Sequence, residues 1–214
     1  MRPLGAFRAG RLVLRRPMLI LLLLQLAACA TPPPQNTADI CSMFNERHNW
    51  YTASKQSERR WGVPIPVSMA IMQQESSFMS HAKPPRSQLF GFIPWTRPSD
   101  AYGYAQALDS TWGEYKESAG NWGARRSDFK DAVDFVGWYA NTSSRQAGIR
   151  KNDAYNLYLA YHEGNGGFLK KTYSGKDWLL KAARNVRENS ARYDTQLQTC
   201  RAHLDRSWFM RLFF

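Results

Sequence analysis

Residues 67–78 read Val67-Ser68-Met69-Ala70-Ile71-Met72-Gln73-Gln74-Glu75-Ser76-Ser77-Phe78. Pro66, directly before this stretch, suits the first turn of a helix because its fixed φ is helical and its missing N–H is not needed there. Steps of three and four residues place one set of side chains on a single helix face: Val67, Ile71, Glu75 and Phe78. The stretch therefore predicts a helix with one carboxylate on its inward, apolar face.

The position of Glu75 predicts an acid that keeps its proton near neutral pH. A carboxylate on an apolar face loses water, which raises its pKa. If the helix ends soon after Ser76, the negative end of the helix dipole raises this pKa further. Most helical glutamates are solvated, so a surface residue without a catalytic role is the alternative. Other segments of the sequence favour the catalytic acid over the surface residue.

The first 28 residues have the features of an export signal. Five arginines precede the apolar run Met18-Leu19-Ile20-Leu21-Leu22-Leu23-Leu24, which is too short to span a bilayer comfortably. The run closes at Leu26-Ala27-Ala28-Cys29, which resembles the bacterial lipobox, where the cysteine becomes the lipidated N-terminus. An ordinary signal peptide cut near Ala28 or Ala30, or an uncleaved anchor, is the alternative.

Lipidation of Cys29 predicts a membrane-attached protein that faces the periplasm. Ala30 follows the cysteine, where an Asp would favour the inner membrane. By resemblance to lipoprotein sorting rules, we expect the outer membrane of a Gram-negative bacterium.

The chain divides into four predicted segments. Residues 1–28 are the lipoprotein signal, residues 29–38 a Pro-rich tether, residues 39–205 one globular domain and residues 206–214 an apolar C-terminal tail. At about 3 Å per residue in polyproline form, the tether would hold the domain roughly 20–30 Å off the membrane. The tail either docks on the domain or lies against a membrane.

The three cysteines separate into one anchor and one pair. If Cys29 is lipidated, Cys41 and Cys200 remain for a disulfide in an oxidising compartment. The chain-entropy model assigns such a long loop about 5 kcal/mol of stabilisation. Two buried, unpaired thiols are the alternative. The four histidines show no metal-ligand spacing, so we predict no metal site and no cofactor.

The formal net charge of +12 limits the partners of the protein. A basic surface can bind nucleic acid, but an export signal argues against that partner. Anionic envelope polymers and lipid headgroups are the acidic partners that remain.

The domain is predicted to be all-α, because helical spacing of apolar residues recurs throughout. The expected helices run from near Asp39 or Ser42 to Arg60, from Pro66 through Glu75, from Asp109 or Ser110 to Gly120, from Ser127 or Asp128 past Tyr139, from Asn152 or Asp153 to Gly164, and from Asp177 past Cys200. No strand pair or repeat is evident. Residues 81–103 form a long irregular segment with four prolines and the exposed-looking Phe90, Phe92 and Trp95, and such a segment is usually functional.

Three segments carry motifs: Gln74-Glu75-Ser76-Ser77-Phe78, Ala101-Tyr102-Gly103-Tyr104-Ala105-Gln106-Ala107-Leu108 and Leu159-Ala160-Tyr161-His162-Glu163-Gly164-Asn165-Gly166. Together, and in this order, they resemble the soluble lytic transglycosylase domain, a relative of goose-type lysozyme. That family shows a Glu-Ser pair at a helix end, then Gly-x-x-Gln, then Ala-Tyr-Asn followed by glycines. The resemblance implies a lysozyme-like, all-α single domain that cleaves peptidoglycan glycan strands between N-acetylmuramic acid and N-acetylglucosamine with formation of a 1,6-anhydro ring.

The resemblance also implies a role for each matching residue. Glu75 is the acid and base, and the substrate supplies the attacking hydroxyl. Ser76 contacts the muramoyl sugar or holds the turn after Glu75. Gln106 orients the substrate or Glu75, and Tyr161 places its hydroxyl near Glu75. Local packing is the alternative for Ser76, Gln106 and Tyr161.

The chain departs from the family pattern in two motifs. Tyr104 and Ala105 stand where the family commonly has Leu-Met, and we expect Tyr104 to add a ring to the substrate cleft. His162 stands in place of the Asn and is expected to contact substrate, and Glu163 after it could act as a second carboxylate. One rival function is therefore a muramidase that uses water, assisted by Glu163 or Asp100. A non-catalytic peptidoglycan-binding lipoprotein is the other.

Overall fold

The structure is a computed structural model that describes residues 31–86, 88–89, 93–94 and 97–213. The chain divides into two units, Met1–Thr31 and Pro32–Phe214, and every described helix and strand belongs to the second. The export signal with Cys29, as well as Phe90, Phe92 and Trp95, lies outside the described residues.

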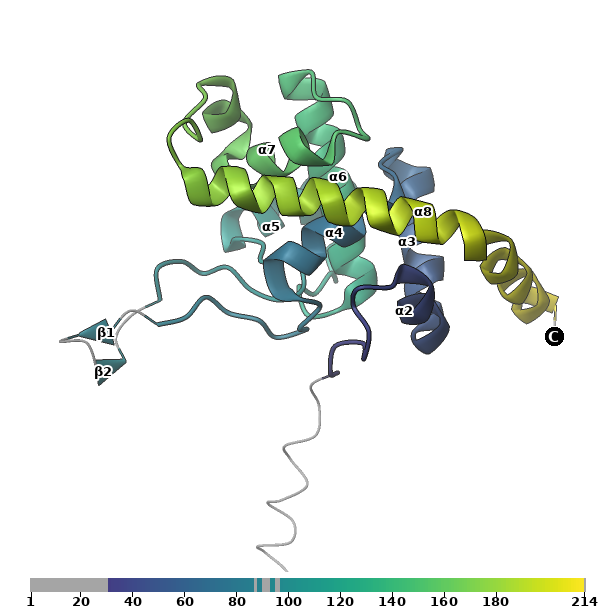
Figure 1. Cartoon of the computed structure of the whole chain (residues 1–214). Coiled ribbons are helices and arrows are strands. Elements are labelled where there is room, and N and C mark those ends of the chain that lie inside the picture. Colours follow the sequence, from purple (N-terminus) through teal and green to yellow (C-terminus); the bar gives the residue numbers. More distant parts are fainter. Residues whose placement is uncertain (1–30, 87, 90–92, 95–96, 214) are drawn as a thin grey trace, which may run out of the picture. The chain divides into compact units, whose positions relative to one another are not determined.

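Seven helices make up most of the described part of this second unit (Figure 1). They are α2 (Ile40–Glu46), α3 (His48–Trp61), α4 (Ile65–Ser76), α5 (Asp109–Ala119), α6 (Phe129–Ala147), α7 (Ala154–Leu169) and α8 (Asp177–Phe213). The predicted all-α class is confirmed. One antiparallel pair was not predicted: β1 (Gln88–Leu89) pairs with β2 (Ile93–Pro94), with Gln88 opposite Pro94. Strands of two residues are too short to show a period in the sequence.

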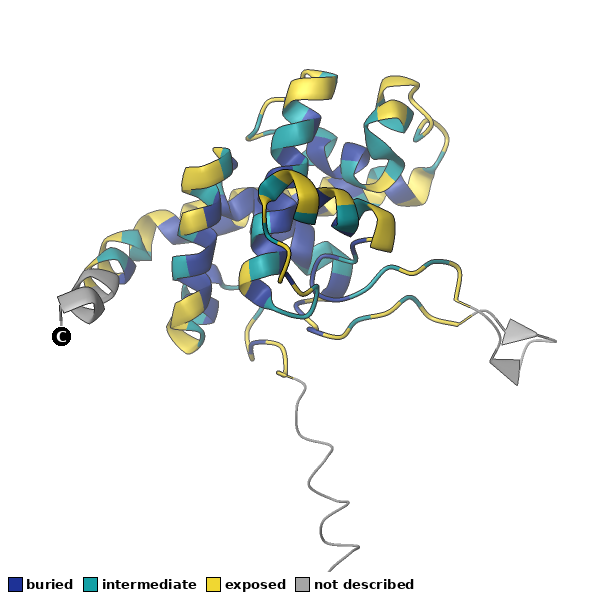
Figure 2. Ribbon diagram, turned by 180° about the vertical axis from the view of Figure 1, so that it is seen from behind, coloured by how far each residue is buried: buried dark blue, intermediate teal, exposed yellow. Residues whose placement is uncertain are grey.

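Helix α4 lies at the centre of the core. Residues 65–72 are all buried, as expected for a helix that is apolar on every face. It packs against α3, α6, α7 and α8, and Figure 2 shows buried residues gathered where these helices face one another. The helix ends directly after Ser76, which meets the condition under which its dipole acts on Glu75. Phe78 lies beyond the helix end with φ 61°, yet it is fully buried.

Aspartate caps begin three of the helices. The side chain of Asp39 accepts hydrogen bonds from the backbone N–H groups at the start of α2, and Asp128 and Asp153 do the same for α6 and α7. These three starts agree with the sequence. The single helix predicted from Asp39 or Ser42 to Arg60 is wrong, because Arg47 leaves the helical region with φ −124° and ψ 71° and separates α2 from α3.

Helix α7 bends at Gly164. The glycine has φ 74° and ψ 158°, a conformation that is essentially restricted to glycine. The sequence predicted that the glycine run would stop the helix there. The regular helix does stop at Gly164, but a further turn follows and ends at Leu169.

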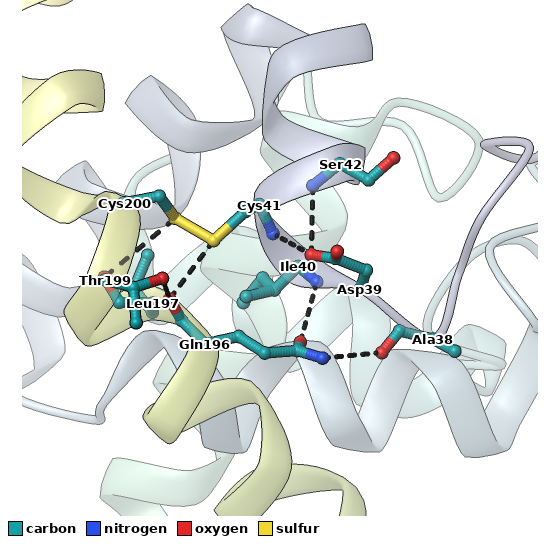
Figure 3. The surroundings of a disulfide bond; sticks show 9 residues. All are labelled: Ala38, Asp39, Ile40, Cys41, Ser42, Gln196, Leu197, Thr199 and Cys200. Atoms are coloured by element: carbon teal, nitrogen blue, oxygen red, sulfur yellow. Dashed lines mark hydrogen bonds between the residues drawn. A yellow bond between two sulfur atoms is a disulfide. The ribbon is translucent and has the colours of Figure 1, made fainter.

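The predicted Cys41–Cys200 disulfide is confirmed and attaches α2 to α8 (Figure 3). Its two Cα atoms lie 6.1 Å apart and are separated by 159 positions in the sequence. Beside it, Gln196 accepts a hydrogen bond from the Ile40 backbone N–H at 3.0 Å and donates one to the Ala38 carbonyl at 3.2 Å. Helix α2 is therefore held by one covalent bond and by a bridging amide.

Residues 32–38 belong to the segment predicted as a tether, and they lie on the domain. Pro34 is buried, and the Gln35 N–H donates to the Glu46 carboxylate at 2.9 Å. The Tyr193 hydroxyl donates to the Thr37 carbonyl. Because these backbone groups have partners on α2 and α8, this part of the predicted tether is packed instead of free.

Helix α8 continues through the predicted C-terminal tail and ends at Phe213. The predicted boundary at residue 206 therefore falls inside one continuous helix. Docking of the tail on the domain or on a membrane stays a prediction. In the part of the chain that the structure describes, no helix combines the length and apolar character needed to cross a membrane.

Candidate active site

Glu75 lies in the last turn of α4 and faces tyrosines of α7. The residue is partly exposed. Burial raises the pKa of its carboxyl from 4.5 to about 7, and a hydrogen bond with Tyr158 partly counters this rise. The pKa of both Tyr158 and Tyr161 is raised by burial and then by the charge of Glu75. Glu75 therefore sits beside two neutral hydroxyl groups and can hold or release a proton near pH 7.

The turn after Glu75 is strained. Ser77 and Phe78 both adopt left-handed backbone angles, with φ 50° and 61°. Such non-glycine residues cost about 1–3 kcal/mol each, and the fully buried side chain of Phe78 holds the turn in place. The helix therefore ends one residue after Glu75, at Ser76. The negative end of a helix dipole favours the protonated form of an acid in the last turn.

Ser76 and Tyr161 hold one short segment against Glu75. The Ser76 hydroxyl donates to the Tyr104 carbonyl at 2.7 Å, and the Tyr161 hydroxyl donates to the Ala105 carbonyl at 2.6 Å. The structure thus brings Glu75, Ser76 and Tyr161 together, and the contacts of the two hydroxyls are with backbone. Both residues position the wall of the site.

Gln106 joins the two ends of the irregular segment. Its side-chain amide donates to the carbonyl groups of Ala82 and Gly103, each at 2.9 Å. Gly103 has φ 77°, and a Cβ there would lie 2.1 Å from the carbonyl oxygen of Arg126, so only glycine fits. The described contacts of the Gln106 amide are with backbone, which means that it shapes the segment beside Glu75.

Tyr104 does not add a ring to an open cleft, and this corrects the expectation. Its side chain is 2% exposed. The ring packs edge-on against Trp50 and Phe129, with centroid distances of 5.7 Å in both cases. A hydrogen bond with Ser80 accompanies this packing. Tyr104 therefore belongs to an aromatic part of the core beneath the site.

Glu163, the residue expected as a possible second carboxylate, is an ion with hydrogen-bonding partners of its own. Lys176 donates to both carboxylate oxygens at 2.8 Å, Thr172 donates a further bond, and Nδ1 of His162 lies 3.1 Å away. Burial would raise the pKa of Glu163, but the hydrogen bonds from these three partners outweigh it and lower the pKa to about 2. His162 also packs edge-on against Trp178 at 5.0 Å. The described contacts of the His162 ring are therefore with Glu163 and Trp178.

Helix geometry explains why Glu163 and Tyr161 have different surroundings. Two positions along a helix correspond to a rotation of about 200°, so Glu163 points away from the side that carries Tyr161. Tyr158, three positions before Tyr161, lies on the same side. Sequence reasoning missed Tyr158 as a site residue, and its i, i+3 relation to Tyr161 was the available signal.

A row of tyrosines leads from Glu75 to a cavity. The rings of Tyr161 and Tyr139 meet edge-on at 5.1 Å, and Tyr139 lines a cavity of about 490 Å³ between α5, α6 and the glycine run of α7. Oγ1 of Thr142 and Oδ1 of Asn165 are buried there without a hydrogen-bond partner among the described residues. Buried polar atoms normally have partners, so this aromatic and polar cavity suits a ligand rich in hydroxyl and amide groups. Among the described residues, no group of three or more His, Cys, Asp or Glu is placed to hold a metal ion.

Comparison with known proteins agrees with this geometry. A family model described as "Transglycosylase SLT domain" matches residues 17–200, which covers most of the chain and all three motif segments. A comparison with curated proteins gives no match. The chain belongs to the transglycosylase SLT domain family, a lysozyme-like, all-α family of transglycosylases whose substrate is peptidoglycan.

Proposed function

We propose that this chain is a lytic transglycosylase that cleaves the β-1,4 bond between N-acetylmuramic acid and N-acetylglucosamine and leaves 1,6-anhydromuramoyl ends. The observation that carries the proposal is the placement of Glu75 at the end of α4 beside Tyr158 and Tyr161, where burial raises its pKa to about 7. A group with this pKa is present in both protonation states at neutral pH. A residue that first donates and then accepts a proton needs both states.

Glu75 acts twice in the proposed reaction. Protonated Glu75 gives its proton to the glycosidic oxygen as the bond to the anomeric carbon breaks, and the 2-acetamido group of the muramoyl sugar stabilises that carbon. Ionised Glu75 then accepts the proton of the C6 hydroxyl, whose oxygen bonds to the anomeric carbon and closes the ring. Most glycosidases use two carboxyl groups, with substrate-assisted families among the exceptions. A nucleophile inside the substrate also reacts at a high effective concentration.

The surroundings of Glu75 support both steps. Burial favours the protonated acid of the first step, and the hydrogen bond with Tyr158 favours the carboxylate that remains after it. Ser76 and Tyr161 hold residues 104 and 105 beside the carboxyl group. The cavity beyond Tyr139 offers space for further sugars of the strand.

The product of sacculus digestion tests the reaction. Mass spectrometry should find muropeptides one water lighter than hydrolysed ones, and Glu75→Gln should abolish them while strand binding remains. Glu188→Gln, a change of an exposed glutamate on α8, is the matched control. Reducing ends alone would support the muramidase assisted by Glu163 or Asp100. Equal lysis by Glu75→Gln and the parent would leave Glu75 without a catalytic role, and strand binding with no turnover by the parent would support the non-catalytic lipoprotein.

The proposed location is the periplasmic face of the outer membrane, with lipid on Cys29. Its support is the sequence Leu26-Ala27-Ala28-Cys29 after a basic and apolar run. The Cys41–Cys200 disulfide is in keeping with an oxidising compartment. Cys29→Ser should leave the membrane fraction and change its mobility on a gel. A variant that stays in the membrane with unchanged mobility would show that Cys29 is not the anchor.

A further inference from the structure

The irregular segment between α4 and α5 has a positively charged pocket at its base. Its two described stretches, residues 82–86 and 97–103, run side by side away from the helices (Figure 2). The cavity between them has a volume of about 320 Å³, and we call it the arm-base pocket. Its described charged lining residues are Lys83, Arg97, Asp100 and Arg126. Three basic side chains thus face one acidic side chain.

Arg126 builds the wall of the arm-base pocket. Its guanidinium donates to the carbonyl groups of Asp100 at 3.1 Å and Ala107 at 2.8 Å, and it lies 2.5 Å from the Asp109 carboxylate. It also covers the ring of Tyr102, with 5.2 Å between the guanidinium carbon and the ring centroid. The charge of Arg126 is therefore compensated by Asp109, and its donors are used within the protein.

Lys83 and Arg97 supply the positive charge of the pocket that no ion pair compensates among the described residues. Both are exposed. Nζ of Lys83 lies 5.4 Å from the ring centroid of Tyr102, and Arg97 donates to the carbonyl of Pro84. Within the described residues, neither cation forms an ion pair with a carboxylate. Because Asp100 is the single acidic side chain among the described lining residues, the pocket keeps a positive potential that attracts anions.

Residues 102–104 connect the arm-base pocket to the end of α4 that carries Glu75. Tyr102 lines the pocket, and its N–H donates to the Ala107 carbonyl at 3.2 Å. Tyr104 follows two positions later, so the two Cα atoms lie at most about 7 Å apart. The carbonyl of Tyr104 accepts the hydrogen bond from Ser76, the neighbour of Glu75. The pocket wall is therefore two positions along the chain from the residue whose carbonyl Ser76 binds.

We propose that the arm-base pocket binds a carboxylate of the glycan strand. This inference rests on the proposed function. The sugar backbone of the substrate is neutral, and its anionic groups are carried by the muramoyl residues. They are the lactyl carboxylate where the peptide has been removed and the stem-peptide carboxylates where it is present. Lysine and arginine bind both through charge-assisted hydrogen bonds, so the pocket makes the enzyme sensitive to what each muramoyl residue carries.

The test uses the full chain with both pocket cations neutralised, as Lys83→Gln combined with Arg97→Gln. The control is Lys181→Gln with Arg184→Gln, which removes the same charge from exposed positions on α8. Three strand preparations are compared: peptide-bearing strands, amidase-treated strands with free lactyl carboxylates, and treated strands whose carboxylates have been converted to amides. Thermal melts of each variant check that it is folded.

The pocket variant should raise KM about tenfold on a charged preparation, with kcat unchanged. The amide strands should show no difference from the parent, and added salt should weaken the parent's preference for charged strands. A rise on peptide-bearing strands identifies the stem peptide as the source of the carboxylate, and a rise on amidase-treated strands identifies the lactyl group. An unchanged KM, an equal rise in the control variant, or an equal rise on amide strands would overturn the proposal.

Binding separates this inference from the proposed function. In a Glu75→Gln background, co-sedimentation with the same strands measures Kd without turnover. If the parent cleaves no strand, the proposed function fails, yet a Kd that depends on Lys83 and Arg97 still supports the pocket. Phosphatidylglycerol vesicles test a phosphate ligand. Loss of vesicle binding in the pocket variant, with strand binding unchanged, would show that the pocket recognises lipid headgroups and would overturn the proposal.

Discussion

The carboxyl of Glu75 lies at the end of α4 between tyrosine hydroxyls, whereas the carboxyl of Glu163 lies on α7 within a set of donors that includes an ammonium group. The first has a pKa of about 7. The second has a pKa of about 2, although its side chain is only 5% exposed. The same residue type therefore occurs twice near the motifs of the family, with opposite protonation behaviour.

This difference shows that burial alone does not make a general acid. Burial destabilises the charged form of both glutamates. At Glu163 this effect is outweighed by hydrogen bonds to the carboxylate from Lys176, Thr172 and His162. At Glu75 the one hydrogen-bonding partner that opposes the rise is a neutral tyrosine. Of the two carboxyls, only Glu75 can donate a proton near pH 7. This contrast supports the proposed mechanism, in which Glu75 is the one protein carboxyl group that acts.

The largest expected effect is on catalysis. Glu75→Gln should lower the rate of strand cleavage by about 10²- to 10⁴-fold, because general acid–base catalysis contributes that much. Glu163→Gln should stay within about tenfold of the parent, once the rate is divided by the folded fraction. Release of anhydro-muropeptides measures both rates. A loss in Glu163→Gln as large as in Glu75→Gln would remove the distinction between the two residues.

The difference in the free energy of unfolding between Glu75→Gln and the parent should depend on pH. Because the folded-state pKa is raised from 4.5 to about 7, the folded protein binds the proton more tightly than the unfolded chain and loses stability as the pH rises between these values. Gln does not titrate, so the variant should be more stable than the parent by about 1–3 kcal/mol at pH 8, with the gap closing near pH 4. Urea unfolding at both values, with the disulfide intact, measures the gap. A difference that is independent of pH would contradict the raised pKa.

For Glu163→Gln, the difference in the free energy of unfolding from the parent should have the opposite sign. Its folded-state pKa is lowered from 4.5 to about 2, so the ionised carboxylate stabilises the fold above the unfolded-state pKa, and this stability is lost as the pH falls between these values. At pH 7 the variant should be less stable by about 1–2 kcal/mol, because the donors of Lys176 and Thr172 lose a charged acceptor. Thermal melts at pH 7 and pH 3.5 should show the gap shrinking. A gap that widens in acid would mean that Glu163 is not held as an ion.

Features that depend on local sequence could be predicted. The aspartate caps at Asp39, Asp128 and Asp153 act on backbone groups two or three positions away, and the structure has all three. The apolar face that surrounds Glu75 also follows from spacing within one helix. The Cys41–Cys200 pair could be predicted by elimination among three cysteines, because Cys29 belongs to the predicted export signal.

Features that depend on distant partners could not be predicted. The negative charge of Glu163 is compensated by Lys176, which lies thirteen positions later in the sequence, beyond a bend and a loop. No helical spacing links the two residues. Tyr104 is buried because its ring packs against Trp50 of α3 and Phe129 of α6, which are distant in the sequence. The break at Arg47 falls inside a stretch whose helical pattern is continuous, and the disulfide that holds α2 forms with the far end of the chain. In each case, tertiary contacts override a local pattern.

The smallest expected effect is a shift in the pH profile of Tyr158→Phe. The hydrogen bond with Tyr158 lowers the pKa of Glu75, so its removal leaves burial unopposed and raises this pKa above about 7. Because the first step needs protonated Glu75, the basic limb of the kcat/KM profile should move to higher pH by about 0.5–1 unit, the equivalent of one hydrogen bond. Tyr155→Phe, on the same helix but with its ring near Arg187, is the control and should leave the limb in place. A shift to lower pH, or an equal shift in Tyr155→Phe, would show that the basic limb of the profile does not report the protonation of Glu75.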